Sequence, residues 1–414
     1  MKISLFNTIK LQLVMPVFLI LFFITACDNN NSTLNISSAE LSQLNHDTSA
    51  HWLTTKLILL PKSTDNNDYI LLKTDNDKNE SIPLVMSETP SELQIKYPHL
   101  RDFQAYHLDI TTAEAKQWLK HQLMVVAFNE EGKAQKVAYV QTGPVLDALY
   151  TQSKHDADEE NALGATIASK AINFKLWAPT AQKVSVLIFD KQSFSQKENN
   201  TFPKELLQLT MTEDSKTGIW HAQGEASLTH HYYQYQLTVY HPASKKVETL
   251  TTTDPYSLSL SVNSKYSQIV DLNDSTTQPK NWVNHKIPVV KHVEDNIFYE
   301  MHIRDFSAID NTLSDEKHRG KYKAFSEQSS DGIKHLKALK EAGLNNIHLL
   351  PTFDIATVNE GSTQVIDLND SMSKLCKLVP SISICQPDHS ANFKAGRTGN
   401  EVLKMNNDLL EKDK

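Results

Sequence analysis

The sequence predicts a multidomain protein in which two β-rich domains precede a unit of alternating strand and helix. The chain has 414 residues, which is too long for one ordinary domain. Between about residues 51 and 275, short apolar runs with period-2 spacing are separated by turn residues, as in strands. After Trp282 the pattern changes to a strand, a helix and a second strand, which is typical of parallel pairing.

Composition excludes two classes of function. With 40% apolar and 22% charged residues, the chain is that of a globular protein. The net charge of −8 includes no Lys/Arg cluster, so we expect no nucleic-acid partner. Only 11 glycines occur and no glycine-rich phosphate motif is formed, so a nucleotide phosphate cradle is not supported.

The first 26 residues have the layout of a secretory signal peptide. Lys2 and Lys10 supply positive charge and the run LQLVMPVFLILFFITA supplies an apolar core, which is short for a membrane-spanning helix. The stretch ITAC resembles the lipobox of bacterial lipoproteins, so Cys27 is expected to be the acylated first residue. The alternative is an ordinary signal peptide with a nearby cysteine. Residues 27–48, rich in Asn and Ser, are predicted to form a flexible tether.

Residues 49–150 are predicted to form a small β-rich domain. Its apolar runs end in VVAFNEEGKAQKVAYV, which indicates a hairpin around Glu130 to Gly132. A short helix is expected over residues 111–119, opened by a Thr cap with Glu114 in its first turn.

Residues 155–275 are predicted to form a β-sandwich of immunoglobulin-like kind. Pro179 cannot donate to a strand ladder, so it should lie at a turn or an edge. Four aromatic side chains could stack on sugar rings, and alternation along the strand makes about half of them core residues. These four are Trp220, Tyr232, Tyr233 and Tyr235, of which Tyr233 and Tyr235 share one face.

From about residue 290 the sequence predicts a βαβ unit. The strand NIFYEMHI is followed by a helix in which Ile333, Leu336, Leu339 and Ala342 lie on one face. Ser330 or Asp331 caps that helix and Gly343 ends it before the strand NNIHLL. We expect the two strands to pair in parallel.

Four stretches resemble successive landmarks of bacterial pullulanases, the starch-debranching members of the α-amylase superfamily. They are NFKLWAPTAQKVSVLIFD, TDPYSLSLSVNSKYSQIVDLND, IFYEMHIRDFSAID and GLNNIHLLPTFDIATVNE. The resemblance implies a carbohydrate-binding sandwich followed by a (β/α)8 catalytic barrel. It also implies retaining hydrolysis of α-1,6 bonds in pullulan and dextrins by two carboxylates about 5–5.5 Å apart.

The resemblance places residues 347–354 on the second barrel strand, so residues 290–414 are expected to hold the first two βα units of an incomplete (β/α)8 barrel. Only 121 residues run from Glu294 to Lys414, whereas a whole barrel takes about 250. The family's D-x-x-x-N-H motif is absent, because Lys280 stands at the Asp position before Asn284 and His285. No catalytic residue is assigned, and the chain alone is predicted to be inactive.

Three carboxylates lie on or just after the predicted strands: Glu300, Asp305 and Asp354. Each could border a sugar cleft, because barrel active sites form at strand ends. The alternative is structural: Glu300 and Asp305 pair with neighbours such as Arg304, and Asp354 holds its loop. His302 and His348 are expected to be hydrogen-bonded strand histidines.

Cys376 and Cys385 lie nine positions apart in a chain expected in an oxidising compartment, which predicts a disulfide. A metal site that includes His389 is the alternative. Calcium follows only from the resemblance, since the two DLNDS stretches lack the loop of an EF-hand, and no ligand or other cofactor is assigned.

The resulting hypothesis is the N-terminal portion of a lipid-anchored debranching enzyme. Its expected partners are α-glucan and the membrane through the lipid anchor. Three explanations for the missing barrel strands stay open: the given sequence is incomplete, the gene is truncated, or a second polypeptide completes the barrel. Its expected location is the surface or the periplasmic side of a bacterial envelope. The alternative is a non-catalytic surface glycan-binding lipoprotein.

Overall fold

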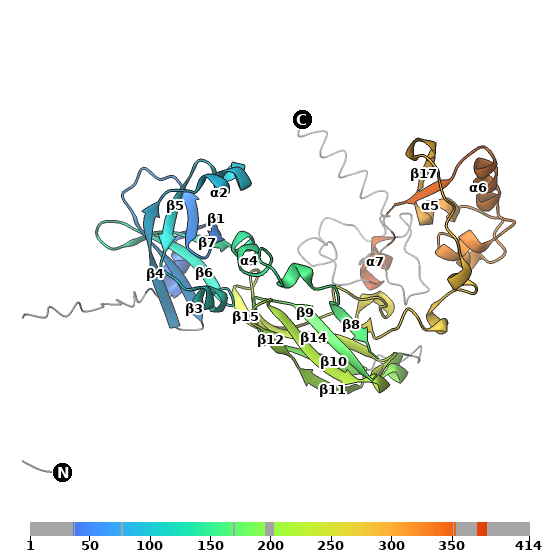
Figure 1. Cartoon of the computed structure of the whole chain (residues 1–414), viewed down its shortest axis with the longest axis horizontal. Helices are drawn as coiled ribbons and strands as arrows, with labels where there is room; N and C mark the ends of the chain where they lie inside the picture. The colour runs from blue at the N-terminus through green and yellow to red at the C-terminus, as the bar shows by residue number, and fades with distance from the viewer. Residues whose placement is uncertain are drawn as a thin grey trace, which may run out of the picture. The chain divides into compact units, whose positions relative to one another are not determined.

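The computed structural model describes residues 36, 38–75, 78–168, 170–194, 203–350, 352 and 371–378 (Figure 1). Its residues gather into two compact units. The first holds residues 1–52, 56–110 and 123–141, and the second holds residues 53–55, 111–122 and 142–414. The predicted signal peptide, Cys27, Asp354 and Cys385 lie outside the described residues.

The first unit is a closed β-barrel of seven strands. They are β1 (Asn45–Thr54), β2 (Leu57–Pro61), β3 (Asp68–Asp75), β4 (Lys78–Ser87), β5 (Phe103–Leu108), β6 (Gln122–Phe128) and β7 (Ala134–Gln141). The strand order is β1-β2-β5-β4-β3-β6-β7, and β7 returns to pair in parallel with β1. The predicted hairpin is confirmed as β6 and β7, and Gly132 in its turn has φ +73°. Two short helices, α2 (Ser91–Lys96) and η1 (Pro98–Leu100), precede β5.

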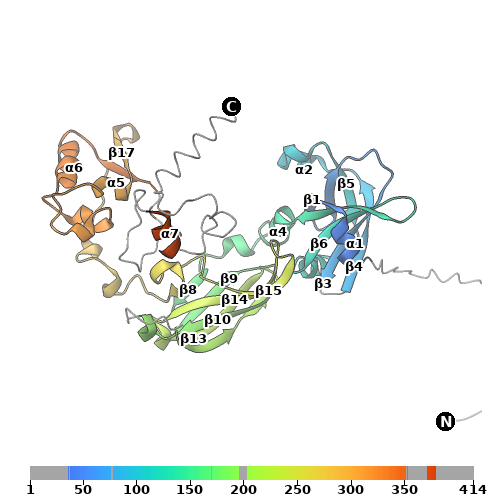
Figure 2. The same cartoon turned by 180° about the vertical axis from the view of Figure 1, so that it is seen from behind.

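The predicted tether of residues 27–48 is too long, because order begins before residue 48. Helix α1 (Ser38–Gln43) leads directly into β1 at Asn45. Ile36 and Leu41 are buried in one apolar cluster with Met124 and Val137 of the barrel. Figure 2 shows α1 beside β6. These two apolar side chains supply the buried surface that the Asn- and Ser-rich composition did not suggest.

Helix α3 (Thr112–Trp118) begins as predicted with a capping box. Thr111 accepts a bond from the Glu114 amide, and the Glu114 carboxylate accepts one from the Thr111 amide. However, α3 is grouped with the second unit, although it falls inside the predicted first domain. The reason is that Lys116 donates to the Ser215 carbonyl and Lys120 pairs with Glu213.

The second unit contains a sandwich of two antiparallel sheets, visible as the green and yellow strands of Figure 1. One sheet has the order β12-β13-β9-β8 and the other the order β11-β10-β14-β15, with β16 paired to β14. The strands are β8 (Gly164–Ile167), β9 (Ala171–Trp177), β10 (Ala181–Phe189), β11 (Glu205–Thr210), β12 (Thr212–Asp214), β13 (Ile219–Glu225), β14 (Tyr232–His241), β15 (Lys246–Thr252) and β16 (Ser267–Gln268). Side chains of both sheets form one core, and Pro179 lies in the turn between β9 and β10 as predicted.

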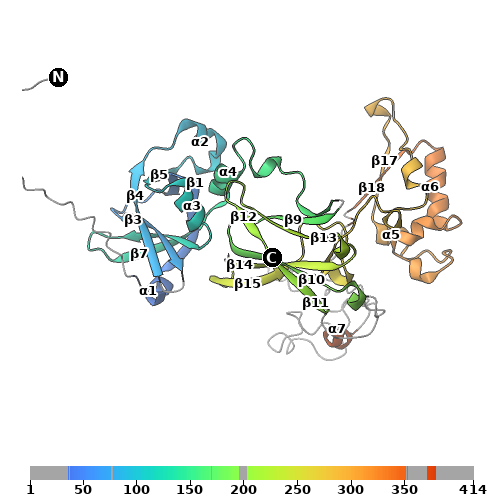
Figure 3. The same cartoon turned by 60° about the horizontal axis from the view of Figure 1, so that its bottom comes forward.

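The predicted strand, helix and strand are also present. They are β17 (Phe298–Met301), α6 (Asp331–Glu341) and β18 (Asn346–Leu349), and the two strands pair in parallel. Ser330 caps α6 by accepting from the Ile333 amide, and Gly343 follows the helix with φ +114°. Figure 3 shows α6 beside the two strands. The face of this helix is less buried than predicted, because Ile333 is buried whereas Ala342 is exposed.

Shorter helices connect these parts. They are α4 (Gly143–Tyr150), η2 (Ala157–Glu159), η3 (Lys191–Phe194), η4 (Ala226–Leu228), η5 (Val262–Ser264), η6 (Ser275–Thr277), η7 (Trp282–Asn284), η8 (Val293–Asp295), α5 (Ile303–Ser307), η9 (Glu316–His318), η10 (Tyr322–Ser326) and α7 (Met372–Leu378). In the part of the chain that the structure describes, no helix has the length and apolarity needed to cross a bilayer.

Candidate functional site

The two faces of β14 have opposite chemistry. Tyr233 and Tyr235 lie on one face of the strand, as the alternation predicted, and both point into the sandwich and are almost fully buried. Their hydroxyl groups donate to Asp254 Oδ2 over 2.7 Å and 3.1 Å. Trp220 is buried in the same core, and its indole N–H donates to the Ala178 carbonyl. These three aromatic residues are therefore structural.

Residues 253–266 connect β15 to β16, and we call this segment the strap. The buried carboxylate of Asp254 joins the strap to the core of the sandwich. Its side chain is 3% exposed, and burial raises its pKa while the two tyrosine donors oppose that shift. The Tyr256 amide donates to Oδ1, and the Asp254 amide donates to Ser267 Oγ. These bonds fix the strap that carries Tyr266.

The outer face of the same sheet carries an aromatic cluster formed by Phe189, Phe194, Tyr232 and Tyr266. The Phe194 ring stacks on the Tyr232 ring with centroids 3.9 Å apart. Tyr266 forms T-shaped ring pairs with Phe189 and Phe194, with ring centroids 4.9 Å and 5.1 Å apart. Phe189 is buried, but the other three rings are partly exposed. Partial burial raises the pKa of the Tyr232 and Tyr266 hydroxyls, so both remain neutral donors at physiological pH.

Polar side chains continue the outer face of β14 beyond the aromatic cluster. Gln234 and Gln236 follow Tyr232 at period 2, and both are partly exposed. Gln234 donates to the Lys265 carbonyl over 2.7 Å, and Gln208 donates to Gln236 over 3.3 Å. An apolar ring surface beside fixed amide groups can bind a ligand that has both apolar faces and hydroxyl groups, as sugars do.

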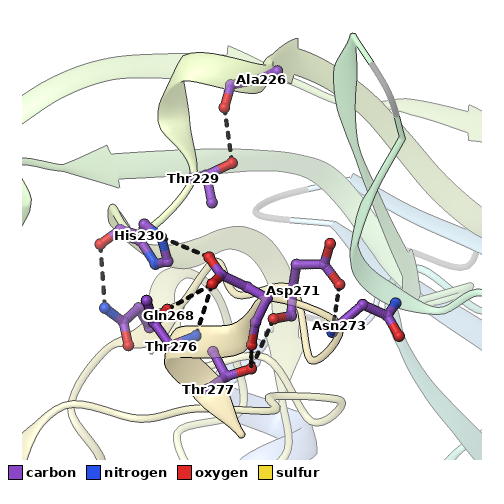
Figure 4. Close-up of polar contacts among 9 residues, drawn as sticks. Ala226, Thr229, His230, Gln268, Asp271, Asn273, Thr276 and Thr277 are labelled. Carbon is purple, nitrogen blue, oxygen red and sulfur yellow. Dashed lines mark hydrogen bonds and ion pairs between the residues drawn. The ribbon is translucent and has the colours of Figure 1, made fainter. Parts of the chain in front are cut away.

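A polar loop lies next to this surface, since Gln268 pairs with Tyr232 in the β14–β16 ladder. Gln268 donates to the His230 carbonyl (Figure 4). His230 Nε2 lies 3.7 Å from Asp274 Oδ2. Asp274 accepts from the amide and hydroxyl of Thr276, which lowers the pKa of its carboxyl. The same figure shows that Asp271 accepts from the Asn273 amide. In this DLNDS stretch, Oδ1 of each Asp accepts a bond from an amide of the same loop, which is the geometry of a turn.

The predicted cleft carboxylates do not form a site together in the described residues. Glu300 is an exposed residue of β17, and Asp305 is exposed in the short helix α5. The structural alternative was pairing with neighbours such as Arg304. Within the described ranges, neither carboxylate forms an ion pair with Arg304, and pairing with other neighbours stays a prediction. His302 caps α5 by accepting from the Arg304 amide over 3.1 Å, and His348 is exposed on β18.

Of the predicted cysteine pair, only Cys376 lies among the described residues. Cys376 is disulfide-bonded, but its partner lies outside the described residues, so its pairing with Cys385 stays a prediction. Among the residues that the structure describes, no three His, Cys, Asp or Glu side chains gather as a metal-binding group. Phe194 and Tyr266 were missed from the sequence because they belong to η3 and to the strap. Only the period-2 alternation at Tyr232 gave a signal.

Three families match the chain in order. Residues 47–148 match the Pullulanase N2 domain, residues 162–257 match Carbohydrate-binding module 48 (Isoamylase N-terminal domain), and residues 355–412 match the Pullulanase Ins domain. The chain is similar to a pullulanase of Klebsiella pneumoniae, with 34% identity over 370 residues that cover 86% of this chain and 32% of the relative. Pullulanase 1 of Arabidopsis thaliana chloroplasts is 34% identical over 273 residues, covering 66% of this chain and 26% of the relative.

Solved structures show the same likeness. The maltotriose complex of PulA from Klebsiella pneumoniae has a TM-score of 0.71 and 32% identity, covering 89% of this chain and 40% of that one. PulA from Klebsiella oxytoca has a TM-score of 0.70 and 33% identity, and the match covers 87% of this chain and 34% of that one.

Fold and surface therefore define a multidomain protein built around a carbohydrate-binding module. Its β-rich domains are of pullulanase type, and the chain corresponds to the N-terminal portion of bacterial pullulanases. It spans about a third of the length of the curated pullulanases from Klebsiella that it matches.

Proposed function

We propose that this chain is the glycan-engaging N-terminal portion of a pullulanase-type debranching glycoside hydrolase. The whole enzyme would hydrolyse α-1,6 bonds in pullulan and starch-derived dextrins with retention. The observation that carries the proposal is the order of the parts: the N2 match, the carbohydrate-binding match, and then the parallel unit β17–α6–β18. The sandwich is taken to be immunoglobulin-like, and β17–α6–β18 to begin a (β/α)8 barrel.

The outer face of β14 is the proposed contact with α-glucan. The partly exposed rings of Phe194, Tyr232 and Tyr266 offer apolar area, and Gln234 and Gln236 offer amide groups to sugar hydroxyls. That a similar structure holds maltotriose supports this ligand class.

Catalysis by the 414-residue chain itself is not expected. Retaining hydrolysis needs two carboxylates about 5–5.5 Å apart. Within the described ranges, Glu300 and Asp305 are both exposed and neither is assigned that role. Further βα units, encoded beyond the given sequence or carried by a second polypeptide, are the proposed route to activity. Anchoring through a lipid on Cys27, export to the bacterial envelope and the disulfide between Cys376 and Cys385 complete the proposal.

A non-catalytic surface glycan-binding lipoprotein is the second candidate. The aromatic cluster favours it, because a binding face on the sandwich functions without a completed barrel. Affinity electrophoresis in gels with amylopectin or pullulan, run beside a reducing-sugar assay, separates the two candidates. Binding without hydrolysis is expected for the chain alone. Hydrolysis after a polypeptide with the later barrel strands is added supports the first candidate, and its continued absence supports the second.

The binding face is tested by Tyr232→Ala. Loss of the stacked ring should weaken amylopectin binding by about tenfold, or ~1.4 kcal/mol. Tyr322→Ala is the matched control, because Tyr322 is an exposed tyrosine outside the sandwich. Equal retardation of both variants, with melting temperatures unchanged, would place the glucan contact elsewhere.

A further inference from the structure

A line of four ring side chains lies on the outside of the closed barrel in the first unit. His51 comes from β1 and Phe103 begins β5, while Tyr97 and His99 lie in the segment between α2 and β5. Figure 2 shows α2 beside β1 and β5. We call these four residues the first-unit aromatic surface. The Pullulanase N2 match covers all of them, and the carbohydrate-binding match covers none of them.

The rings of this surface contact one another in sequence. Phe103 and His51 form a T-shaped pair with ring centroids 5.5 Å apart. The centroids of His51 and His99 are 6.5 Å apart, and those of His99 and Tyr97 are 6.4 Å apart. The Lys96 ammonium lies 5.5 Å from the centroid of the Tyr97 ring. His99 is exposed and the other three rings are partly exposed, so solvent reaches every ring.

The backbone beneath these rings is held by the barrel core. His51 precedes the fully buried Trp52 on β1, so alternation along the strand turns the His51 ring outward. Leu100 is 4% exposed and anchors the short helix η1 in the core. The Tyr97 amide donates to the Leu93 carbonyl over 2.8 Å, which fixes the end of α2. A surface that is already ordered loses little conformational freedom when a ligand binds, and this favours affinity.

The polar atoms of these side chains are available to a ligand. Within the described ranges, neither the imidazoles of His51 and His99 nor the Tyr97 hydroxyl forms a hydrogen bond. Burial lowers the pKa of His51 and the nearby His99 lowers it further, so the His51 imidazole is neutral at pH 7. A neutral imidazole has one donor and one acceptor nitrogen. Flat apolar rings beside free donors and acceptors suit a ligand with both C–H faces and hydroxyl groups.

We propose that the first-unit aromatic surface is a second contact for α-glucan, separate from the outer face of β14. This inference rests on the proposed function, which supplies the ligand class. The net charge of −8 disfavours an anionic polymer and agrees with a neutral one. Two contacts on one chain make the second binding event to a polymer intramolecular, so the polymer is bound more tightly than either contact alone would bind it. A long, flexible glucan can reach both contacts without a fixed distance between the units.

Affinity electrophoresis of the full chain in amylopectin gels tests this contact. His99→Ala should weaken binding about tenfold, because it removes an exposed ring from the middle of the line and so one of two contacts. His107→Ala is the matched control, since His107 is an exposed histidine on β5 of the same unit. His99→Tyr keeps a ring with a polar tip and should retain most of the binding. Equal retardation of His99→Ala and His107→Ala would overturn the proposal.

Calorimetric titration with maltotriose, the ligand in a similar structure, separates this proposal from the proposed function. The wild type should show about two sites per chain, and His99→Ala and Tyr232→Ala should each keep about one. Two sites remaining in His99→Ala would overturn the second contact and leave the proposed function intact. A site lost in His99→Ala but not in Tyr232→Ala would support the second contact and contradict the one on β14.

Two further results complete the test. A wild type that binds neither maltotriose nor amylopectin would overturn both contacts. Melting temperatures show whether the variants are folded, and Tyr97→Ala, which removes the neighbouring ring, repeats the test if His99→Ala unfolds. Full binding by a folded Tyr97→Ala variant would then overturn the proposal.

Discussion

Apolar side chains are buried in the sandwich, whereas many of them are exposed in the segment that follows it. In the sandwich, Phe174 and Tyr235 are completely buried in a core shared by two sheets. In residues 280–350, Phe298 is 66% exposed and Val289 is 90% exposed. Exposed apolar surface on this scale is typical of an interaction surface. The comparison teaches that the sandwich holds its own core, whereas β17–α6–β18 leaves much of its apolar surface uncovered in the described residues.

The largest expected effect is the difference between an alanine substitution of an aromatic residue in the sandwich and one in the segment that follows it. Tyr235→Ala should lower the free energy of unfolding by about 3–5 kcal/mol, because it empties a buried site and removes a donor to Asp254. Phe298→Ala should change it by less than about 0.5 kcal/mol. Urea denaturation followed by circular dichroism measures both. Similar losses in the two variants would show that Phe298 is covered in solution.

The buried ion pair between Lys120 and Glu213 should rank second. It ties α3 to the sandwich, with side chains that are 8% and 19% exposed. Lys120→Met should cost about 2–3 kcal/mol because it leaves a carboxylate without its partner. The double variant Lys120→Met/Glu213→Leu should recover part of that loss. Thermal unfolding of the three proteins measures the difference, and no recovery in the double variant would argue against a coupled pair.

Asp254 should make the sandwich sensitive to pH. Burial raises its pKa in the folded state, so its stabilising contribution is fully present below the unfolded value of 3.8 and is lost as pH rises through the folded pKa. Asp254→Asn does not titrate. It should lose hydrogen bonds worth about 1 kcal/mol at low pH, and this deficit against the wild type should shrink as pH rises. Denaturation at a series of pH values checks the sign, and a deficit that grows with pH would contradict it.

The capping box of α3 should give the smallest effect. Thr111→Ala removes the side-chain bond to the Glu114 amide and should cost about 1 kcal/mol. Thr142, which precedes α4, forms no capping bond, so Thr142→Ala is the control and should be nearly neutral. Melting temperatures of the two variants measure the contrast. Equal melting temperatures would mean that the cap contributes nothing beyond local geometry.

Features with local signals could be predicted from the sequence. Ser330 and Gly343 bound α6 because a cap and a positive φ are properties of single residues. Alternation likewise placed Tyr233 and Tyr235 on one face, and the structure shows that this face is the core, which Trp220 also joins. The docking of α3 was missed because Lys120 meets Glu213, a residue 93 positions away. The aromatic cluster was only partly found, since Phe194 and Tyr266 join Tyr232 from separate segments of irregular chain.

The parallel seam between β1 and β7 has a consequence for how the chain acquires its shape during synthesis. Asn45 pairs with Lys136, so the two sides of the seam are made far apart in time. At about 5–20 residues per second, several seconds separate the appearance of one edge from that of the other. During that interval β1 cannot yet pair with β7, and the barrel closes only when β7 has been synthesised. A chaperone that shields β1 would therefore act before the barrel has closed.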